Sequence, residues 1–368
     1  MISSQPENTV GKFRRHGALA AGCAAALILF AALFIFMWRT GPSGGPETKE
    51  PREAPKADRG EASEIAEPTA TDVREESTEE PAPEPRLVAS LELPYGSGPG
   101  SVGLIDDPEQ DIAGAESFAV RAGGVFLIAD TVNQRLLRAE AERGAVAEID
   151  LPRDAVAADI AVDAHGRLLV FDYAGRIDWY GETGDRLGSL PVDMDRWEVR
   201  TGLRVVGDML LMSDVDQRDH LLAVLEADGP RPPRPEELAE WDGEGFLTES
   251  GNRLTAGLER WQSGWVEVDR PDGSPQRFDV DAPGIVSLRV LGEDAAGNPH
   301  LQVERVENGR VVLEVHRHNR DGERTGLLRL PQNDYHHWTI RLLSMDANGW
   351  IYQALPGGDG FAMFIYSF

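Results

Sequence analysis

The sequence has very little cysteine and a shortage of basic residues, and each shortage excludes a class of protein. Cys23 is the only cysteine, so the chain has no internal disulfide framework. The chain has 36 Lys and Arg against 63 Asp and Glu, a formal net charge of −27. No segment supplies the basic face that nucleic-acid binding requires. We therefore expect no nucleic-acid partner.

Long helical patterns and common catalytic motifs are missing after residue 86. No G-x-S-x-G nucleophile turn or phosphate-binding loop occurs in residues 87–368. Asp214-x-Asp216-x-x-Asp219 lacks the glycine and the distal glutamate of a calcium loop. Residues 235–241 could form one or two helical turns. The remainder of the region favours β-structure without a recognisable catalytic constellation.

The sequence contains one apolar run long enough to span a membrane, residues 17–38. Lys12, Arg14 and Arg15 precede this run, and the chain after it becomes acidic. The positive-inside rule places residues 1–16 in the cytoplasm as a short tail. A cleaved signal peptide is the alternative, but the run is longer than its usual apolar region and no small-x-small site closes it. We expect a signal anchor in the inner (plasma) membrane, with the rest of the chain periplasmic or extracellular.

Residues 39–86 are rich in proline and acidic residues and poor in large apolar ones. Such a segment cannot bury enough apolar surface to fold, so we expect a disordered linker. Its physical role would be a tether that holds the following domain, residues 87–368, near the membrane.

A repeated unit dominates residues 87–368. Residues 118–130 align with residues 160–172, and residues 207–214 form a third copy. In each copy a glycine turn leads into a short apolar strand that ends in Asp, and the terminal residues Asp130, Asp172 and Asp214 are spaced 42 residues apart. The strands are apolar on both faces, which suits sheets packed between other sheets.

Six glycine turns mark the repeat along the domain. They lie 41 to 52 residues apart, at Gly124, Gly166, Gly207, Gly251, Gly297 and Gly349. A period of this length is typical of four-stranded propeller blades. Residues 87–93 and 361–368 read as strands that could pair and close the ring. The sequence thus predicts an all-β, six-bladed β-propeller with four-stranded blades.

Residues 117–138 resemble an NHL-type repeat, in which an apolar strand ends in Asp and is followed by Asn and Arg. Asp130, Asn133 and Arg135 fit this pattern. The second copy keeps Asp172 and Arg176, the third keeps Asp214 and Arg218, and the later copies depart widely. The resemblance implies a six-bladed propeller in which these Asp and Arg side chains stabilise turns rather than form a site.

Six-bladed propellers also include gluconolactonase-like hydrolases, which hold a divalent metal at the channel mouth with Glu, Asn and Asp. The positions eight residues before the turn glycines should test this alternative. They are Glu116, Ala158, Val199, Gly243, Arg289 and Arg341. These residues do not form a coherent set of oxygen ligands, so we expect no metal site and leave any cofactor open.

Arg289 and Arg341 occupy the same repeat position in neighbouring blades, and Glu116 holds it in the blade that follows. Two guanidinium groups at the channel mouth could bind a carboxylate or phosphate of a small-molecule ligand. The alternative is that Glu116 and nearby acidic residues neutralise them.

Two further features remain. His316-x-His318 and His336-His337 could ligate a metal, but no third ligand is identifiable, and we expect solvent-facing strand histidines. The proline-rich stretch from Pro230 to Pro235 is either a stiff partner-binding arm or a plain inter-blade loop. We predict a non-catalytic scaffold or recognition domain for an envelope protein, with a gluconolactonase-like hydrolase as the alternative.

Overall fold

The computed structural model describes residues 84–368 except 110, 122, 154, 193–199, 242, 260–261, 333–335 and 338. The expected tail, the expected membrane anchor and nearly all of the expected linker lie outside these residues. Within the described part of the chain, no helix is long and apolar enough to cross a bilayer.

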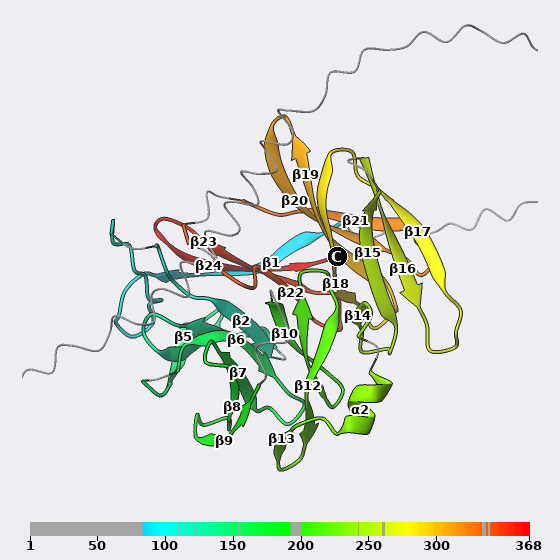
Figure 1. The fold of residues 1–368 in the computed structure, drawn as a ribbon. Helices are drawn as coiled ribbons and strands as arrows, with labels where there is room; N and C mark the ends of the chain where they lie inside the picture. The colour runs from blue at the N-terminus through cyan, green and yellow to red at the C-terminus, as the bar shows by residue number, and fades with distance from the viewer. Residues whose placement is uncertain are drawn as a thin grey trace, which may run out of the picture. The chain divides into compact units, whose positions relative to one another are not determined.

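The described residues form six four-stranded antiparallel sheets (Figure 1), as the repeat predicted. We number these blades from the first complete one. Blade one contains β2 (Ser117–Arg121), β3 (Val125–Asp130), β4 (Arg135–Glu140) and β5 (Gly144–Asp150). Blade two contains β6 (Ala157–Val162), β7 (Leu168–Asp172), β8 (Arg176–Tyr180) and β9 (Arg186–Pro191). Blade three contains β10 (Arg200–Val206), β11 (Met209–Asp214), β12 (Asp219–Glu226) and β13 (Gly229–Arg231).

The remaining blades follow the same order from the innermost strand outward. Blade four contains β14 (Phe246–Leu247), β15 (Arg253–Glu259), β16 (Ser263–Asp269) and β17 (Gln276–Asp281). Blade five contains β18 (Ile285–Glu293), β19 (Pro299–Glu307), β20 (Arg310–His318) and β21 (Arg324–Arg329). Blade six contains β22 (Leu343–Met345), β23 (Ile351–Pro356), β24 (Gly360–Ser367) and, as its outermost strand, β1 (Arg86–Pro94).

The ring is closed by strands from the two ends of the domain. β1 pairs antiparallel with β24, in a register that runs from Arg86 opposite Ser367 to Pro94 opposite Gly360. Figure 1 shows the blue-cyan β1 beside the red β24. This pairing confirms the predicted closure, and it makes blade six depend on both ends of the domain.

All six predicted glycines lie in the turns between the innermost and second strands, and all have positive φ, from +58° at Gly207 to +82° at Gly251. Only glycine adopts this conformation without strain. In blades two, five and six an Asp three residues earlier accepts backbone N–H bonds from two residues of the same turn. The repeat in the sequence therefore reflects the residues that each of these turns requires.

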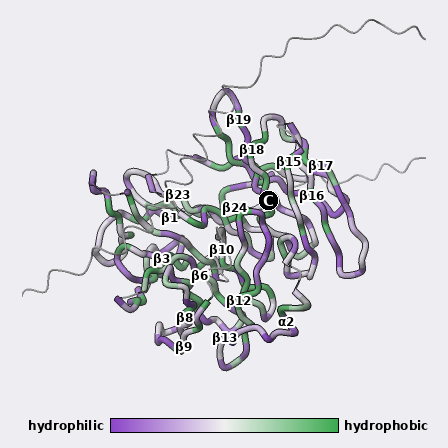
Figure 2. The backbone as a smooth tube through the Cα atoms, viewed as in Figure 1, coloured by the Kyte–Doolittle hydropathy of each residue, from purple (hydrophilic) through white to green (hydrophobic). Residues whose placement is uncertain are grey.

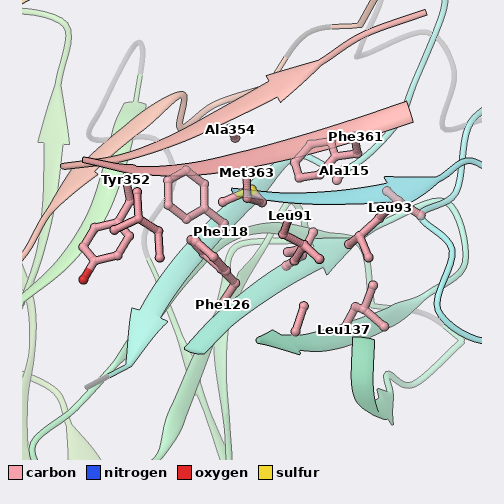
Figure 3. Close-up of a cluster of buried hydrophobic side chains, with 14 residues drawn as sticks. Leu91, Leu93, Ala115, Phe118, Phe126, Leu137, Tyr352, Ala354, Phe361 and Met363 are labelled. Carbon is pink, nitrogen blue, oxygen red and sulfur yellow. The ribbon is translucent and has the colours of Figure 1, made fainter. Parts of the chain in front are cut away.

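The hydrophobic core consists of six clusters, and each cluster lies at one of the six interfaces between neighbouring blades. Figure 3 shows the cluster between blades six and one, where Phe126 meets Phe118 and Tyr352 edge-on at ring distances of 6.4 and 5.9 Å. Apolar stretches follow the strands while polar ones gather at turns (Figure 2). Both faces of a blade are thus buried, which explains the uninterrupted apolar strands.

The interface between blades three and four is the exception. Its cluster has only four buried residues, because β14 is two residues long. The connection between these blades holds the helix α2 (Pro235–Glu240), which confirms the short helix expected there. The proline-rich stretch is folded into this connection, since Gly229–Arg231 forms β13 and Arg231 pairs with Glu226 and Glu237. It is an inter-blade segment and not a free arm.

Candidate functional site at the channel mouth

One end of the ring, which we call the mouth face, carries the links between successive blades and the turns between the second and third strands. Strand direction alternates within each blade, so these two kinds of connection come together. The turns after Asp130, Asp172 and Asp214 lie here. Glu116 and Arg341 lie here too, just before the innermost strands β2 and β22.

Arg341 is bound within the ring. Its Nη2 pairs with Asp159 Oδ2 at 2.9 Å and also donates to the carbonyl of Leu203, and its Nη1 donates to the carbonyl of Phe118 at 3.2 Å. These contacts reach from blade six to blades two, three and one. The side chains of Arg341 and Asp159 are 13% and 3% exposed. The guanidinium therefore holds the innermost strands together, and Asp159, not Glu116, is its carboxylate partner.

Side chains satisfy the free backbone edges of the innermost strands. These edges have no neighbouring strand, and buried N–H and C=O groups need partners. On β10, Asp159 accepts a hydrogen bond from the N–H of Leu203, and Arg341 donates one to the carbonyl of Leu203. On β18, Gln217 of blade three accepts from the N–H of Val290 and donates to the carbonyl of Leu288 at 3.2 Å.

The short strand β14 is held in the same way. Asp219 Oδ2 accepts from the N–H of Leu247 at 2.7 Å, and Arg204 Nη1 donates to its carbonyl at 2.9 Å. Arg204 also pairs with Asp219 and stacks on Phe246, 3.5 Å from the ring centre. Polar contacts from blade three thus supplement the small apolar cluster at this interface.

Glu116 and Arg289 are the two candidates that this network does not use. Burial raises the pKa of Glu116 to about 7, although the hydrogen bond from Tyr173 Oη, at 3.2 Å, acts in the opposite direction. A carboxyl group that titrates near neutrality is suited to proton transfer. Arg289 is half-buried on β18 and has no side-chain hydrogen bond or ion pair to a described residue. Among the described residues, no hydrogen bond or ion pair joins the side chains of Glu116, Arg289 and Arg341, and an anion site formed by the three stays a prediction.

The first of the expected turn constellations is buried and fully paired. Asp130 Oδ2 accepts from Arg135 Nε at 2.9 Å and from Asn133 Nδ2 at 2.8 Å, while Oδ1 accepts from the N–H of Gly103 at 2.9 Å. Arg135 also donates to the carbonyls of Gly98 and Ser101. These contacts fasten the connection from β1 to β2 onto blade one, so their role is structural.

The second and third constellations are simpler. Asp172 pairs with Arg176 at 2.8 Å. Asp214 accepts the backbone N–H of Arg218 at 2.9 Å, but its side-chain partner is His220 at 3.0 Å, and Arg218 is exposed. The sequence pattern therefore predicted the turn at Asp214 correctly. It named Arg218 as the side-chain partner of Asp214, whereas the structure has His220 in that role.

The expectation of solvent-facing histidines is wrong for His316, His318 and His337, which are 1%, 3% and 4% exposed. His316 pairs with Glu314 at 3.0 Å, and His318 donates to the carbonyl of Gly322 at 2.9 Å. Both faces of β20 are covered by neighbouring blades, which alternation along one strand could not reveal. Among the described residues, no three His, Cys, Asp or Glu side chains are grouped so as to hold a metal ion.

Several residues of the mouth face were missed from the sequence. Gln217, Tyr173 and Arg204 matter because of what they contact in other blades. Gln217 has one unusual property that could have drawn attention to it: it is a non-glycine residue with a positive φ of +62°, in the turn after Asp214. That signal is conformational and is not visible in the letters of the sequence.

No family model and no curated protein match this chain. Among solved structures, a DUF4221 family member from Bacteroides vulgatus is similar over 77% of this chain and 98% of its own, with 11% identity and a TM-score of 0.45. The PQQ-bound aldose sugar dehydrogenase from Streptomyces coelicolor is similar over 78% and 99%, with 11% identity and a TM-score of 0.43. Virginiamycin B lyase from Staphylococcus aureus is similar over 72% and 98%, with 11% identity and a TM-score of 0.39. Likeness at these levels carries no argument about a site, and the six-bladed propeller rests on the sheet topology of the chain itself.

Proposed function

We propose that this chain is a membrane-tethered recognition domain that binds a partner protein through its mouth face and catalyses no reaction itself. The observation that carries this proposal is the distribution of exposed apolar side chains, most of which gather on that face. They are Ile105, Ile112, Val156, Tyr173, Val215, Leu258, Val306 and Val311.

Tyr173 has the properties of an interface anchor. It is 51% exposed at the turn between β7 and β8, its hydroxyl is held by Glu116, and its backbone N–H donates to the carbonyl of Val156 at 3.2 Å. Aromatic side chains ringed by aliphatic ones dominate the binding energy of many interfaces. Most polar groups beneath this surface bind one another, so a partner that excludes water there breaks few hydrogen bonds.

The acidic charge at one edge of the mouth face indicates the chemistry of the partner. The connection from β1 to β2 places Asp106, Asp107 and Asp111 beside the exposed Ile105 and Ile112. A partner surface that combines basic and apolar residues would complement this edge and bind more weakly in high salt.

The proposal includes the expected placement in the cell. Residues 17–38 would anchor the chain in the inner membrane, and residues 39–86 would tether the propeller outside it. A tether raises the effective concentration of the propeller near other envelope proteins. The partner would therefore be an exported envelope protein.

The test is in-cell cross-linking of the full chain, followed by affinity capture and mass spectrometry. One variant combines Tyr173→Ser with Val215→Glu. The matched control is Leu187→Glu, which alters an equally exposed apolar side chain on the outer strand β9. We expect a specific envelope protein with the unchanged chain and the control, and its loss with the mouth-face variant. Equal capture by both variants would remove the mouth face as the recognition surface.

A gluconolactonase-like hydrolase is the second candidate, and the raised pKa of Glu116 favours it. In that case Glu116 would act as a general acid or base near neutral pH, and the channel would bind a divalent metal. Lactone turnover by the full chain that requires added divalent cation, and that Glu116→Gln abolishes, would establish this function in place of the first.

A further inference from the structure

The end of the ring opposite the mouth face has a cavity region between blades four and five. Two adjoining cavities of about 190 and 280 Å³ share walls formed by the turns after β14 and β18 and by the turn between β20 and β21. The shared lining residues are Ser250, Asn252, Glu293, Gly297 and Arg320. This region is separate from the mouth face, because these turns lie at the other ends of the strands.

Two arginines line the first cavity, and neither forms a salt bridge with a described carboxylate, although Arg270 interacts electrostatically with the exposed Asp272. Arg270 donates to the amide oxygen of Gln276 and to the carbonyl of Arg320. Arg320 Nε donates to the carbonyl of Ala296 at 2.8 Å. The hydrogen bonds of both side chains go to neutral acceptors, so several guanidinium N–H groups stay available for a ligand.

Gly297 allows Arg320 to lie against its turn. A Cβ atom at this position would come within 2.5 Å of Arg320 Nε, and φ at Gly297 is +78°. The glycine that the repeat requires for its turn thus also makes room for a guanidinium group at the cavity wall.

A fixed carboxylate also lines both cavities. Glu293 accepts from Asn252 Nδ2 at 2.8 Å, from Thr248 Oγ1 at 2.9 Å and from the hydroxyl of Ser250. Three donors hold this side chain, but its two oxygens have capacity for a further hydrogen bond. The region therefore presents both cationic donors and a carboxylate acceptor to a ligand.

We propose that this region binds a small carboxylic acid that also carries hydroxyl or ammonium groups. Its carboxylate would pair with Arg270 and Arg320 through charge-assisted hydrogen bonds. Its donor groups would face Glu293, and Val268 and Pro299 would contact its carbon chain. A phosphate dianion fits less well than a carboxylate, because Glu249, Glu293 and Asp294 in the walls repel two negative charges more strongly than one.

The test is isothermal titration of the full chain with four probes: gluconate, alanine, propionate and inorganic phosphate. Gluconate and alanine carry both a carboxylate and donor groups. Propionate lacks the donors, and phosphate lacks the carbon chain. We expect gluconate or alanine to bind at least tenfold more tightly than propionate and phosphate.

Variants then locate the site. Arg270→Gln and Arg320→Gln should each weaken binding of the preferred acid at least tenfold. Arg310→Gln is the matched control, because it removes the same charge from an exposed position at the mouth-face end of blade five, the blade of Arg320. Thermal unfolding of each variant checks that the fold is intact, and Arg320→Lys, which keeps the charge but loses the planar fork, replaces any variant that fails.

Three results would overturn the proposal. The first is binding of neither gluconate nor alanine, and the second is phosphate binding as tightly as either. The third is unchanged affinity in both arginine variants. None of these results bears on the mouth face, so the two proposals fail independently.

Discussion

Replacing Arg341 by methionine should destabilise the propeller far more than any exposed arginine substitution. Arg341 lies in the channel, where one guanidinium joins blade six to Asp159, Leu203 and Phe118 of three other blades. Methionine keeps much of the side-chain volume and removes the charge and all the donors. The structure therefore isolates the polar contribution of this residue.

The magnitude follows from what is left behind. Removing one partner of a buried ion pair costs about 3–5 kcal/mol, because the other charge stays buried and uncompensated. The carbonyls of Leu203 and Phe118 also lose a donor, at about 1–3 kcal/mol for each that water cannot reach. Because the Arg341 side chain is 13% exposed, water can solvate part of the vacated site. We expect a net loss of about 3–5 kcal/mol in the free energy of unfolding.

The assay is urea unfolding of the full chain, followed by the fluorescence of its 8 tryptophans. A double-mutant cycle adds Asp159→Asn, which removes the opposite charge. The double variant should be less destabilised than the sum of the two single variants by at least about 1 kcal/mol. Arg310→Met, at an exposed position, should change stability by less than about 0.5 kcal/mol. A loss below about 1 kcal/mol for Arg341→Met, or strict additivity in the cycle, would refute this reasoning.

Three other predictions concern stability. Burial lowers the pKa of His300 and of His318 from 6.5 to about 4, so the unfolded chain holds more protons than the folded chain between these values. Their stabilisation is complete above pH 6.5 and is lost as pH falls toward 4, while the raised pKa of Glu116 acts oppositely between about 7 and 4.5. The net loss by pH 4.5 should be about 2–3 kcal/mol. Replacing both histidines by glutamine should reverse the slope of urea midpoint against pH, because of these three groups only Glu116 then remains, and its raised pKa stabilises the folded chain as pH falls. Phe126→Ala should cost about 3–5 kcal/mol in the same assay because its ring is fully buried, whereas an effect under about 1 kcal/mol would mean that the cluster in Figure 3 repacks. In hydrogen exchange read by mass spectrometry, the segments at the interface of blades three and four should exchange faster than those at the other five interfaces, since its apolar cluster is the smallest.

The repeat made the fold predictable. Each glycine turn needs a positive φ, which restricts the residue type locally, and six such turns at a blade-like spacing indicate six blades. The closing strands were recognisable for a similar reason, since β1 and β24 are short apolar segments outside complete units. The copies after the third depart widely from the pattern in the sequence, and in the structure the innermost strand of blade four has only two residues.

The candidate site was less predictable, because its chemistry depends on contacts between blades. Arg341 was noticed from its repeat position, but its partner Asp159 lies 182 residues away in sequence. The buried histidines of β20 were misjudged, because one strand does not reveal which neighbouring blade covers each face. The available arginines at the opposite end, Arg270 and Arg320, lie in turns that the repeat pattern treats as ordinary connections.

The sequence by itself determined the blade period, the positions of the turn glycines and the strands that close the ring, because these depend on local backbone conformation and short apolar runs. Tertiary structure decided which polar groups form hydrogen bonds or ion pairs within the protein and which stay available to a ligand or partner. Only the closed ring brings Arg341 to Asp159 and Gln217 to β18. Only the packed blades bury Glu116 enough to raise its pKa to about 7. The physical reason is that the free energy of a charge or a hydrogen-bonding group depends on what surrounds it, and here the surroundings come from distant parts of the chain.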